Sequence, residues 1–196
     1  MKTEAPGIIR PLAKAFAEAD PATEGKRMMA GPDALQAFAR FKTDDLGEVL
    51  RTALKNKDVQ MRATAAGLIA DVPPTDENID SLNEAFDYAW KNDVESNDAI
   101  LATLDALFKL AKTGARGTVS AFLLATASPD QLVRMKALQI LKDDDYKNKR
   151  ELQEYLASTA AKNTVHVQPF GGKGTKIGQI LTKDADYRRA LSRKNG

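Results

Sequence analysis

Few side chains in this chain could carry out covalent or metal chemistry. The sequence of 196 residues has no cysteine and a single histidine, His166. A thiolate nucleophile and a thiolate metal site are therefore excluded. A general base or a metal ligand needs partners, and no acidic cluster lies near His166 in the sequence. We expect His166 to be a surface or packing residue, and we predict no catalytic, cofactor-binding or metal site.

Glycine, lysine and threonine occur together in GGKGTKIG, residues 171–178. A phosphate-binding loop requires Gly-x4-Gly-Lys-Ser/Thr at the end of a strand, because backbone N–H groups must surround the phosphate. Here Gly172-Lys173 is followed by Gly174, and Val167 stands five residues before Gly172. Neither spacing is met, so the segment predicts an extended or loop conformation and no nucleotide site.

The strongest pattern of charged residues is an acid followed four residues later by a base. Asp58 and Arg62 precede an apolar stripe, and the same pattern returns 72 residues later at Asp130 and Arg134. Repetition without a gap is typical of stacked supersecondary units. We interpret these residues as helix caps and cross-links between helices, since a regular period accounts for them without chemistry.

Four apolar quartets supply the first helices of these units. Spacing of three, one and three residues places each quartet on one helical face. The steps between quartets are 36, 37 and 33 residues. Trp90, after the second quartet, is expected to line the core or a groove. The quartets are Leu46/Val49/Leu50/Ala53, Leu82/Ala85/Phe86/Ala89, Val119/Phe122/Leu123/Thr126 and Leu152/Tyr155/Leu156/Thr159.

Second helices are predicted to start at Asp58, Asp93 and Asp130, each after a short polar turn. Aspartate at a helix start accepts hydrogen bonds from free N–H groups and complements the helix dipole. In the third copy Ser128 is a further N-cap candidate, because Pro129 follows it. Two upstream helices, near residues 11–19 and 33–41, are expected to form a capping hairpin. The first should bury the face of Leu12, Ala15, Phe16 and Ala19.

The second helices resemble HEAT repeats, whose Asp and Arg positions Asp58/Arg62 and Asp130/Arg134 match. The resemblance covers roughly residues 33–161. It implies an all-α fold, an α-α superhelix of antiparallel hairpins, with Asp58, Arg62, Asp93, Asp130 and Arg134 in a ladder between neighbouring repeats. The middle repeat departs, because Asn97 stands where Arg is expected. We expect one weakened contact between neighbouring repeats there, with looser packing or a bend.

The last residues, DYRRALSRKNG (186–196), resemble the connector before a cyclophilin-type prolyl isomerase domain in bacterial proteins with HEAT repeats. The resemblance implies that this chain is the region ahead of a catalytic barrel. The barrel's own motifs have no counterpart here, so no catalytic residue is carried over. A short helix is expected from Thr182 onward, ending a largely irregular, Gly-rich and basic tail.

The distribution of charge along the chain indicates which class of partner it binds. Eight of the 29 Lys/Arg and two of the 27 Asp/Glu follow residue 161, so the tail carries +6 and residues 1–161 carry −4. An acidic body argues against nucleic acid as a partner. We therefore expect a helical repeat domain, 1–161, and a tail or linker, 162–196. The expected function is a non-enzymatic scaffold that binds a protein or peptide segment on its concave face.

Two alternatives remain open at this point: an accessory region of a prolyl isomerase, and a nucleic-acid-binding HEAT-like domain. No cofactor is expected. The sequence contains no apolar run long enough to span a bilayer and no signal peptide at its start, which favours the cytoplasm by default.

Overall fold

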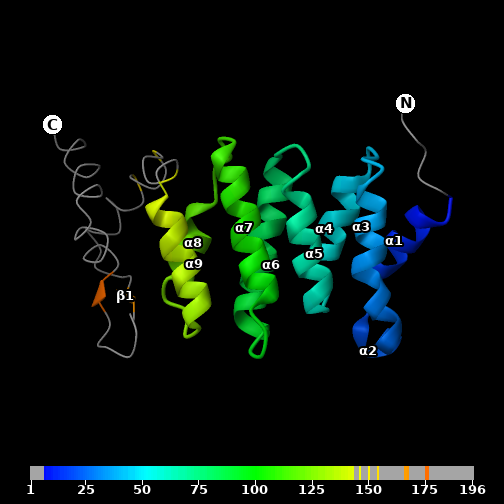
Figure 1. Cartoon of the computed structure of the whole chain (residues 1–196), viewed down its shortest axis with the longest axis horizontal. Helices are drawn as coiled ribbons and strands as arrows, with labels where there is room; N and C mark the ends of the chain where they lie inside the picture. The colour runs from blue at the N-terminus through cyan, green and yellow to red at the C-terminus, as the bar shows by residue number, and fades with distance from the viewer. Residues whose placement is uncertain are drawn as a thin grey trace. The chain divides into compact units, whose positions relative to one another are not determined.

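The computed structural model describes residues 7–143, the single residues Tyr146, Arg150 and Glu154, and residues 166–167 and 175–176. The chain divides into two compact units, residues 1–115 and 116–196. The predicted boundary after residue 161 lies outside the described residues and stays a prediction. Within the described part, the chain is built from helices that pack on helices, which confirms the all-α class (Figure 1). The finer prediction of an α-α superhelix stays a prediction.

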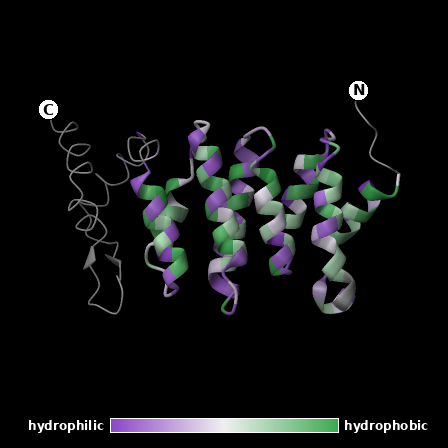
Figure 2. Ribbon diagram, in the orientation of Figure 1, coloured by the Kyte–Doolittle hydropathy of each residue, from purple (hydrophilic) through white to green (hydrophobic). Residues whose placement is uncertain are grey.

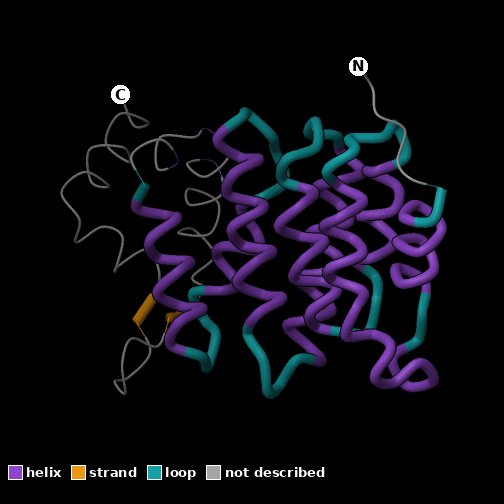
Figure 3. The backbone as a smooth tube through the Cα atoms, turned by 45° about the vertical axis from the view of Figure 1, so that its right-hand side comes forward, coloured by secondary structure: helices purple, strands orange, loops and turns teal. Residues whose placement is uncertain are grey.

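Unit 1 consists of three helical hairpins joined by short loops (Figure 3). Two short elements connect the helices of the first hairpin: α2 (Pro21–Glu24) and the 3₁₀ helix η1 (Gly25–Ala30). The hairpins pair α1 with α3, α4 with α5, and α6 with α7. Their bounds are α1 Ile9–Glu18, α3 Gly31–Ala39, α4 Leu46–Leu54, α5 Val59–Ile69, α6 Asp76–Asn92 and α7 Asp98–Lys112.

The helices of unit 1 form two layers. Helices α1, α4 and α6 contact one another in sequence order and form the first layer. Helices α3, α5 and α7 do the same and form the second layer. Figure 2 shows apolar and polar residues alternating along these helices, as helices with one buried face require. The predicted order of first and second helices is therefore confirmed for these three hairpins.

The apolar quartets form the core between the layers. All four residues of the α4 quartet and all four of the α6 quartet are buried. Leu50 and Leu82 have no exposed surface, so each removes a large apolar side chain from water. The third quartet, in α8, is also buried. The fourth quartet, residues 152–159, lies outside the described residues.

The prediction for the first helix was correct in place and wrong in face. Helix α1 buries Ala13 and Ala17, whereas Leu12 is 42% exposed. The small side chains face α3 and α4, because alanine lets helices approach closely. Leu12, Ala15 and Phe16 instead line an open apolar pocket of about 510 Å³.

The predicted start of the middle second helix was wrong. Helix α6 continues to Asn92, and α7 begins only at Asp98, with Asn97 as N-cap. Asp93 is the C-cap residue of α6. Its carboxylate is bound by an arginine of α5, so it does not cap α7. Asp98, in the first turn of α7, supplies the negative charge that the helix dipole favours.

Unit 2 contains the hairpin of α8 (Val119–Ala125) and α9 (Gln131–Lys142). Tyr146 is buried there and packs edge-on against Phe122, with ring centroids 5.2 Å apart. Its hydroxyl lies 3.2 Å from the Thr118 hydroxyl. Ser128 is not an N-cap: the helix begins at Gln131, and Asp130 caps it.

Two short strands are described in the tail, β1 (His166–Val167) and β2 (Thr175–Lys176), which pair antiparallel. The extended or loop conformation predicted for residues 171–178 is confirmed at Thr175 and Lys176. The helix predicted from Thr182 lies outside the described residues.

Candidate docking groove and buried polar network

Asp58 occupies the N-cap of α5, where its side chain accepts a hydrogen bond from the Met61 N–H at 2.9 Å. Asp130 occupies the N-cap of α9 and accepts from Leu132 and Val133. Both residues have extended backbone, which turns the carboxylate toward the free N–H groups of the first turn. The predicted capping role of these two residues is confirmed.

Arg62 is fully buried and forms an ion pair between neighbouring hairpins. Its Nη2 donates to both carboxylate oxygens of Asp93, at 2.5 Å each, and its Nη1 donates to the Asn56 carbonyl at 2.6 Å. The guanidinium also lies 4.7 Å from the ring centroid of Tyr88. A buried charge needs a partner of this kind, since an isolated one is too costly to keep out of water.

Asn56 extends this network to the first hairpin. Its Nδ2 donates to the Ala19 and Ala17 carbonyls, at 2.8 and 3.1 Å, at the C-terminal end of α1. Its Oδ1 accepts the Asp58 N–H at 2.8 Å. The carbonyls at the end of a helix have no partner within the helix, so Asn56 satisfies them from the next hairpin. Asn56, Arg62 and Asp93 together link all three hairpins of unit 1.

The second copy of the pattern repeats the local part of this geometry. Arg134 Nη1 donates to the Ser128 carbonyl at 2.6 Å, as Arg62 does to Asn56. The Ser128 hydroxyl accepts the Asp130 N–H at 3.1 Å, as the Asn56 amide oxygen does for Asp58. Among the described residues, Arg134 has no carboxylate partner. The repeat of 72 residues therefore copies the turn and the cap.

Asn97, where the pattern departs, forms no side-chain cap at α7. The neighbouring Asp98 accepts a hydrogen bond from Gln60 Nε2 at 2.8 Å, which links α5 with α7. Trp90 is half-buried and stacks on Phe86 with ring centroids 5.8 Å apart, as a core-lining residue would.

The charged side chains described so far cap helices or form ion pairs and hydrogen bonds between helices. Within residues 7–143, no three His, Asp or Glu side chains come together to hold a metal ion. The hydrogen bond from the Lys57 ammonium lowers the pKa of Asp20 from its ordinary value, and the hydrogen bond from the Ala22 N–H lowers it further. The hydrogen bond that the Lys57 ammonium donates to that carboxylate raises the pKa of Lys57. Neither change brings a group toward neutral pH, where a general base works best.

The second layer of unit 1 carries an open groove. It lies between α3 and α5 and has a volume of about 650 Å³. Its walls are largely apolar and small, and the buried Leu46 lies at its base. Gln36 and Thr64 are the uncharged polar residues in it. The complete lining is Gln36, Ala39, Arg40, Lys42, Leu46, Ala63, Thr64, Gly67, Leu68, Asp71 and Val72.

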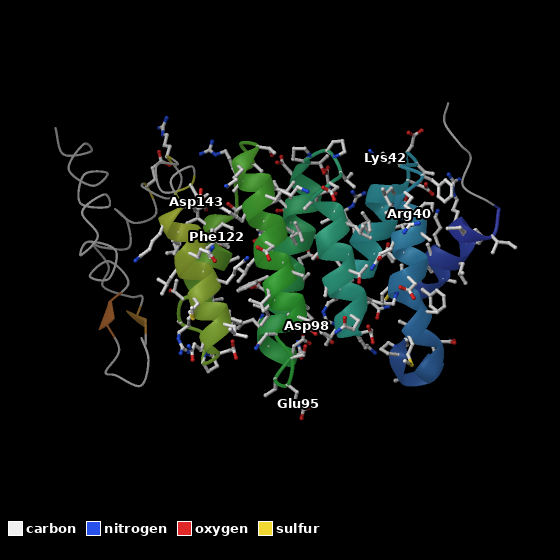
Figure 4. All side chains as sticks on the ribbon, viewed as in Figure 1. Arg40, Lys42, Glu95, Asp98, Phe122 and Asp143 are labelled. Atoms are coloured by element: carbon white, nitrogen blue, oxygen red, sulfur yellow. The ribbon has the colours of Figure 1, made fainter. Side chains whose placement is uncertain are left out.

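Three charged residues border this groove. Arg40 and Lys42 are exposed at the end of α3 (Figure 4), and neither side chain has a partner among the described residues. Asp71, by contrast, forms an ion pair with Lys109 of α7. Because the acid is already paired and the two bases are not, the groove border presents positive charge to a ligand.

The sequence patterns predicted the caps and missed the groove. Gly67 lies in the last turn of α5, where a β-carbon would meet nothing within 4 Å. Glycine inside a helix is destabilising relative to alanine, so its presence at an exposed helical position was a signal that the repeat pattern does not explain. Lys42 has a backbone φ of 49°, which no sequence pattern indicated.

No helix in the described part of the chain is long and apolar enough to cross a membrane. The segment that resembles a cyclophilin connector, residues 186–196, lies outside the described residues. The chain matches no family model, no curated protein and no solved structure.

Proposed function

We propose that this chain is a non-enzymatic protein-interaction domain of the HEAT-repeat type, which binds a protein segment on its second layer of helices. The observation that carries the proposal is the groove between α3 and α5, because it combines an apolar base with an exposed border. Ligand sites in proteins are typically recesses lined by apolar residues with a few polar groups.

The buried network supports the scaffold part of the proposal. Asn56, Arg62 and Asp93 tie three hairpins together through hydrogen bonds, which limits the movement of the first hairpin, which carries α3, against the second, which carries α5. A rigid groove loses less entropy on binding than a mobile one, which favours recognition by this face.

The proposal is tested by selecting binders from a display library of random 12-residue peptides on the immobilised full chain. Gly67→Ala and Gly67→Gln place progressively larger side chains in the groove without a clash at the β-carbon. We expect selected peptides to bind more weakly in the order Gly, Ala, Gln, with a loss of about tenfold or more for glutamine. Ser120→Gln, at an exposed position of α8, is the matched control and should leave binding unchanged.

Failure to select any peptide, or selection of peptides that bind all four chains equally, would contradict the groove as the interaction site. Prolyl isomerase turnover by this chain above background would contradict the non-enzymatic part of the proposal.

A further inference from the structure

We propose that the groove between α3 and α5 takes a short acidic peptide segment, whose Asp or Glu side chain is held by Arg40 and Lys42. The inference rests on the proposed function and names the chemistry of its partner. Its first basis is charge: the two bases have no partner among the described residues, whereas the groove's acid, Asp71, is paired with Lys109. A guanidinium binds a carboxylate through two parallel hydrogen bonds, and the nearby ammonium adds a second positive charge.

Backbone conformation at Lys42 is a second, independent basis. Its φ of 49° lies in the left-handed region, where glycine is preferred over lysine. A residue held in this region persists at a cost, and such positions gather at ligand sites. Glycine at position 42 would relieve this strain, whereas lysine keeps a positive charge at the groove border.

Gly67 and its neighbours supply the third basis. The open space above Gly67 lets a peptide backbone approach α5 closely, and Ala63 beside it is also small. Gln36 and Thr64 have no side-chain partner among the described residues, so the groove holds hydrogen-bond groups for that backbone.

The same groove is poorly suited to nucleic acid. None of its lining residues is aromatic, whereas single-stranded nucleic acid is bound by stacking bases on aromatic rings. Two bases beside an acid also supply too little charge for a phosphate backbone that is contacted at many points.

The experiment compares peptide selection on the wild-type chain with selection on the double variant Arg40→Glu/Lys42→Glu. Asp and Glu should be enriched in peptides selected on the wild type. Affinity for these peptides should fall about tenfold or more in the variant and should also fall as salt is raised toward about 1 M. Lys91→Glu/Arg116→Glu is the matched control: it reverses one lysine and one arginine at exposed positions outside the groove.

Two further variants separate the possible failures. Arg40→Gln/Lys42→Gln removes the charges without adding acids and should give an intermediate loss. Selected peptides that are neutral, or that are weakened by Gly67→Gln and not by the charge reversals, would overturn this inference and leave the proposed function standing. Selection of no peptide would overturn both. Retention of a labelled 12-nucleotide single strand, lost in the Arg40→Glu/Lys42→Glu variant, would also overturn it in favour of a nucleic-acid ligand.

Discussion

At the scale of single residues, Arg62 makes the buried ion pair that joins two neighbouring hairpins of unit 1. It is the largest fully buried side chain in the described part of the molecule, and its charge is balanced by Asp93 from the next hairpin. The sequence predicted both Arg62 and Asp93 as parts of an Asp–Arg ladder between repeats, but it also placed Asp93 at the start of the following helix, which is wrong. The error has a physical origin: a partner 31 residues away competes for the carboxylate, and no local pattern reports that contact.

Removal of the Asp93 carboxylate should destabilise unit 1 strongly. We expect Asp93→Ala to lower the free energy of unfolding by about 3–5 kcal/mol, because it leaves the Arg62 charge buried without a counter-ion. The measurement is urea unfolding followed by circular dichroism. Lys109→Ala breaks the exposed ion pair with Asp71 and is the control, with an expected cost below about 1 kcal/mol. Equal costs for the two variants would contradict the role assigned to Arg62.

The pair of Asp20 and Lys57 should make stability depend on pH at the acid end. The folded-state pKa of Asp20 lies below its unfolded value, so its contribution is fully present above the unfolded pKa. It is lost as the pH falls below the ordinary value of 3.8 and through the lower folded pKa. Asp20→Asn keeps an acceptor for the α2 cap and should flatten this part of the curve of urea midpoint against pH.

Lys57→Gln removes the partner and should flatten the same region of that curve. A curve with unchanged acid dependence in both variants would show that the pair does not contribute. Because the pKa of Lys57 is raised, its own contribution is present below its unfolded pKa and is lost only at alkaline pH.

At the scale of helices, local rules predicted much of the structure. The quartets placed α4, α6 and α8 because a buried helical face has a fixed period. Asp58 and Asp130 placed the starts of α5 and α9 because capping is a contact within a few residues. The buried face of α1 was wrong, since Ala13 and Ala17 are chosen by close packing against neighbours and not by hydrophobicity.

Two glycines on neighbouring helices should respond oppositely to the same substitution. Gly67→Ala should raise the free energy of unfolding by about 0.5–1 kcal/mol, because alanine favours helix and its β-carbon meets open space. Gly31→Ala should lower it by about 1–3 kcal/mol, because the β-carbon would lie 2.6 Å from Met61 Sδ, which is buried. Thermal unfolding of the two variants, compared with the wild type, checks both signs.

Loss of stability in Gly67→Ala would mean that another group occupies the space above Gly67 in solution. The groove would then lack the open space that the proposed peptide needs. Gain of stability with weaker peptide binding would support the open space, since that combination is typical of a site where function opposes stability.

At the scale of the whole molecule, the features on which the proposed function rests belong to unit 1. Unit 1 holds the network of Asn56, Arg62 and Asp93 and the groove between α3 and α5. The sequence predicted a binding face from the repeat architecture alone and placed no residue in it. It could not do so because a groove is defined by side chains that are small or absent, such as Gly67, and by helices brought together from different hairpins.

The central claim is that a protein segment binds in the groove of unit 1. Its most direct test is an NMR titration of the ¹⁵N-labelled full chain with a peptide selected on it. We expect the amide signals that shift most to belong to the groove, among them those of Arg40, Lys42, Thr64 and Gly67. Shifts that cluster on α1, α4 and α6 or in unit 2, with these four signals unchanged, would contradict it.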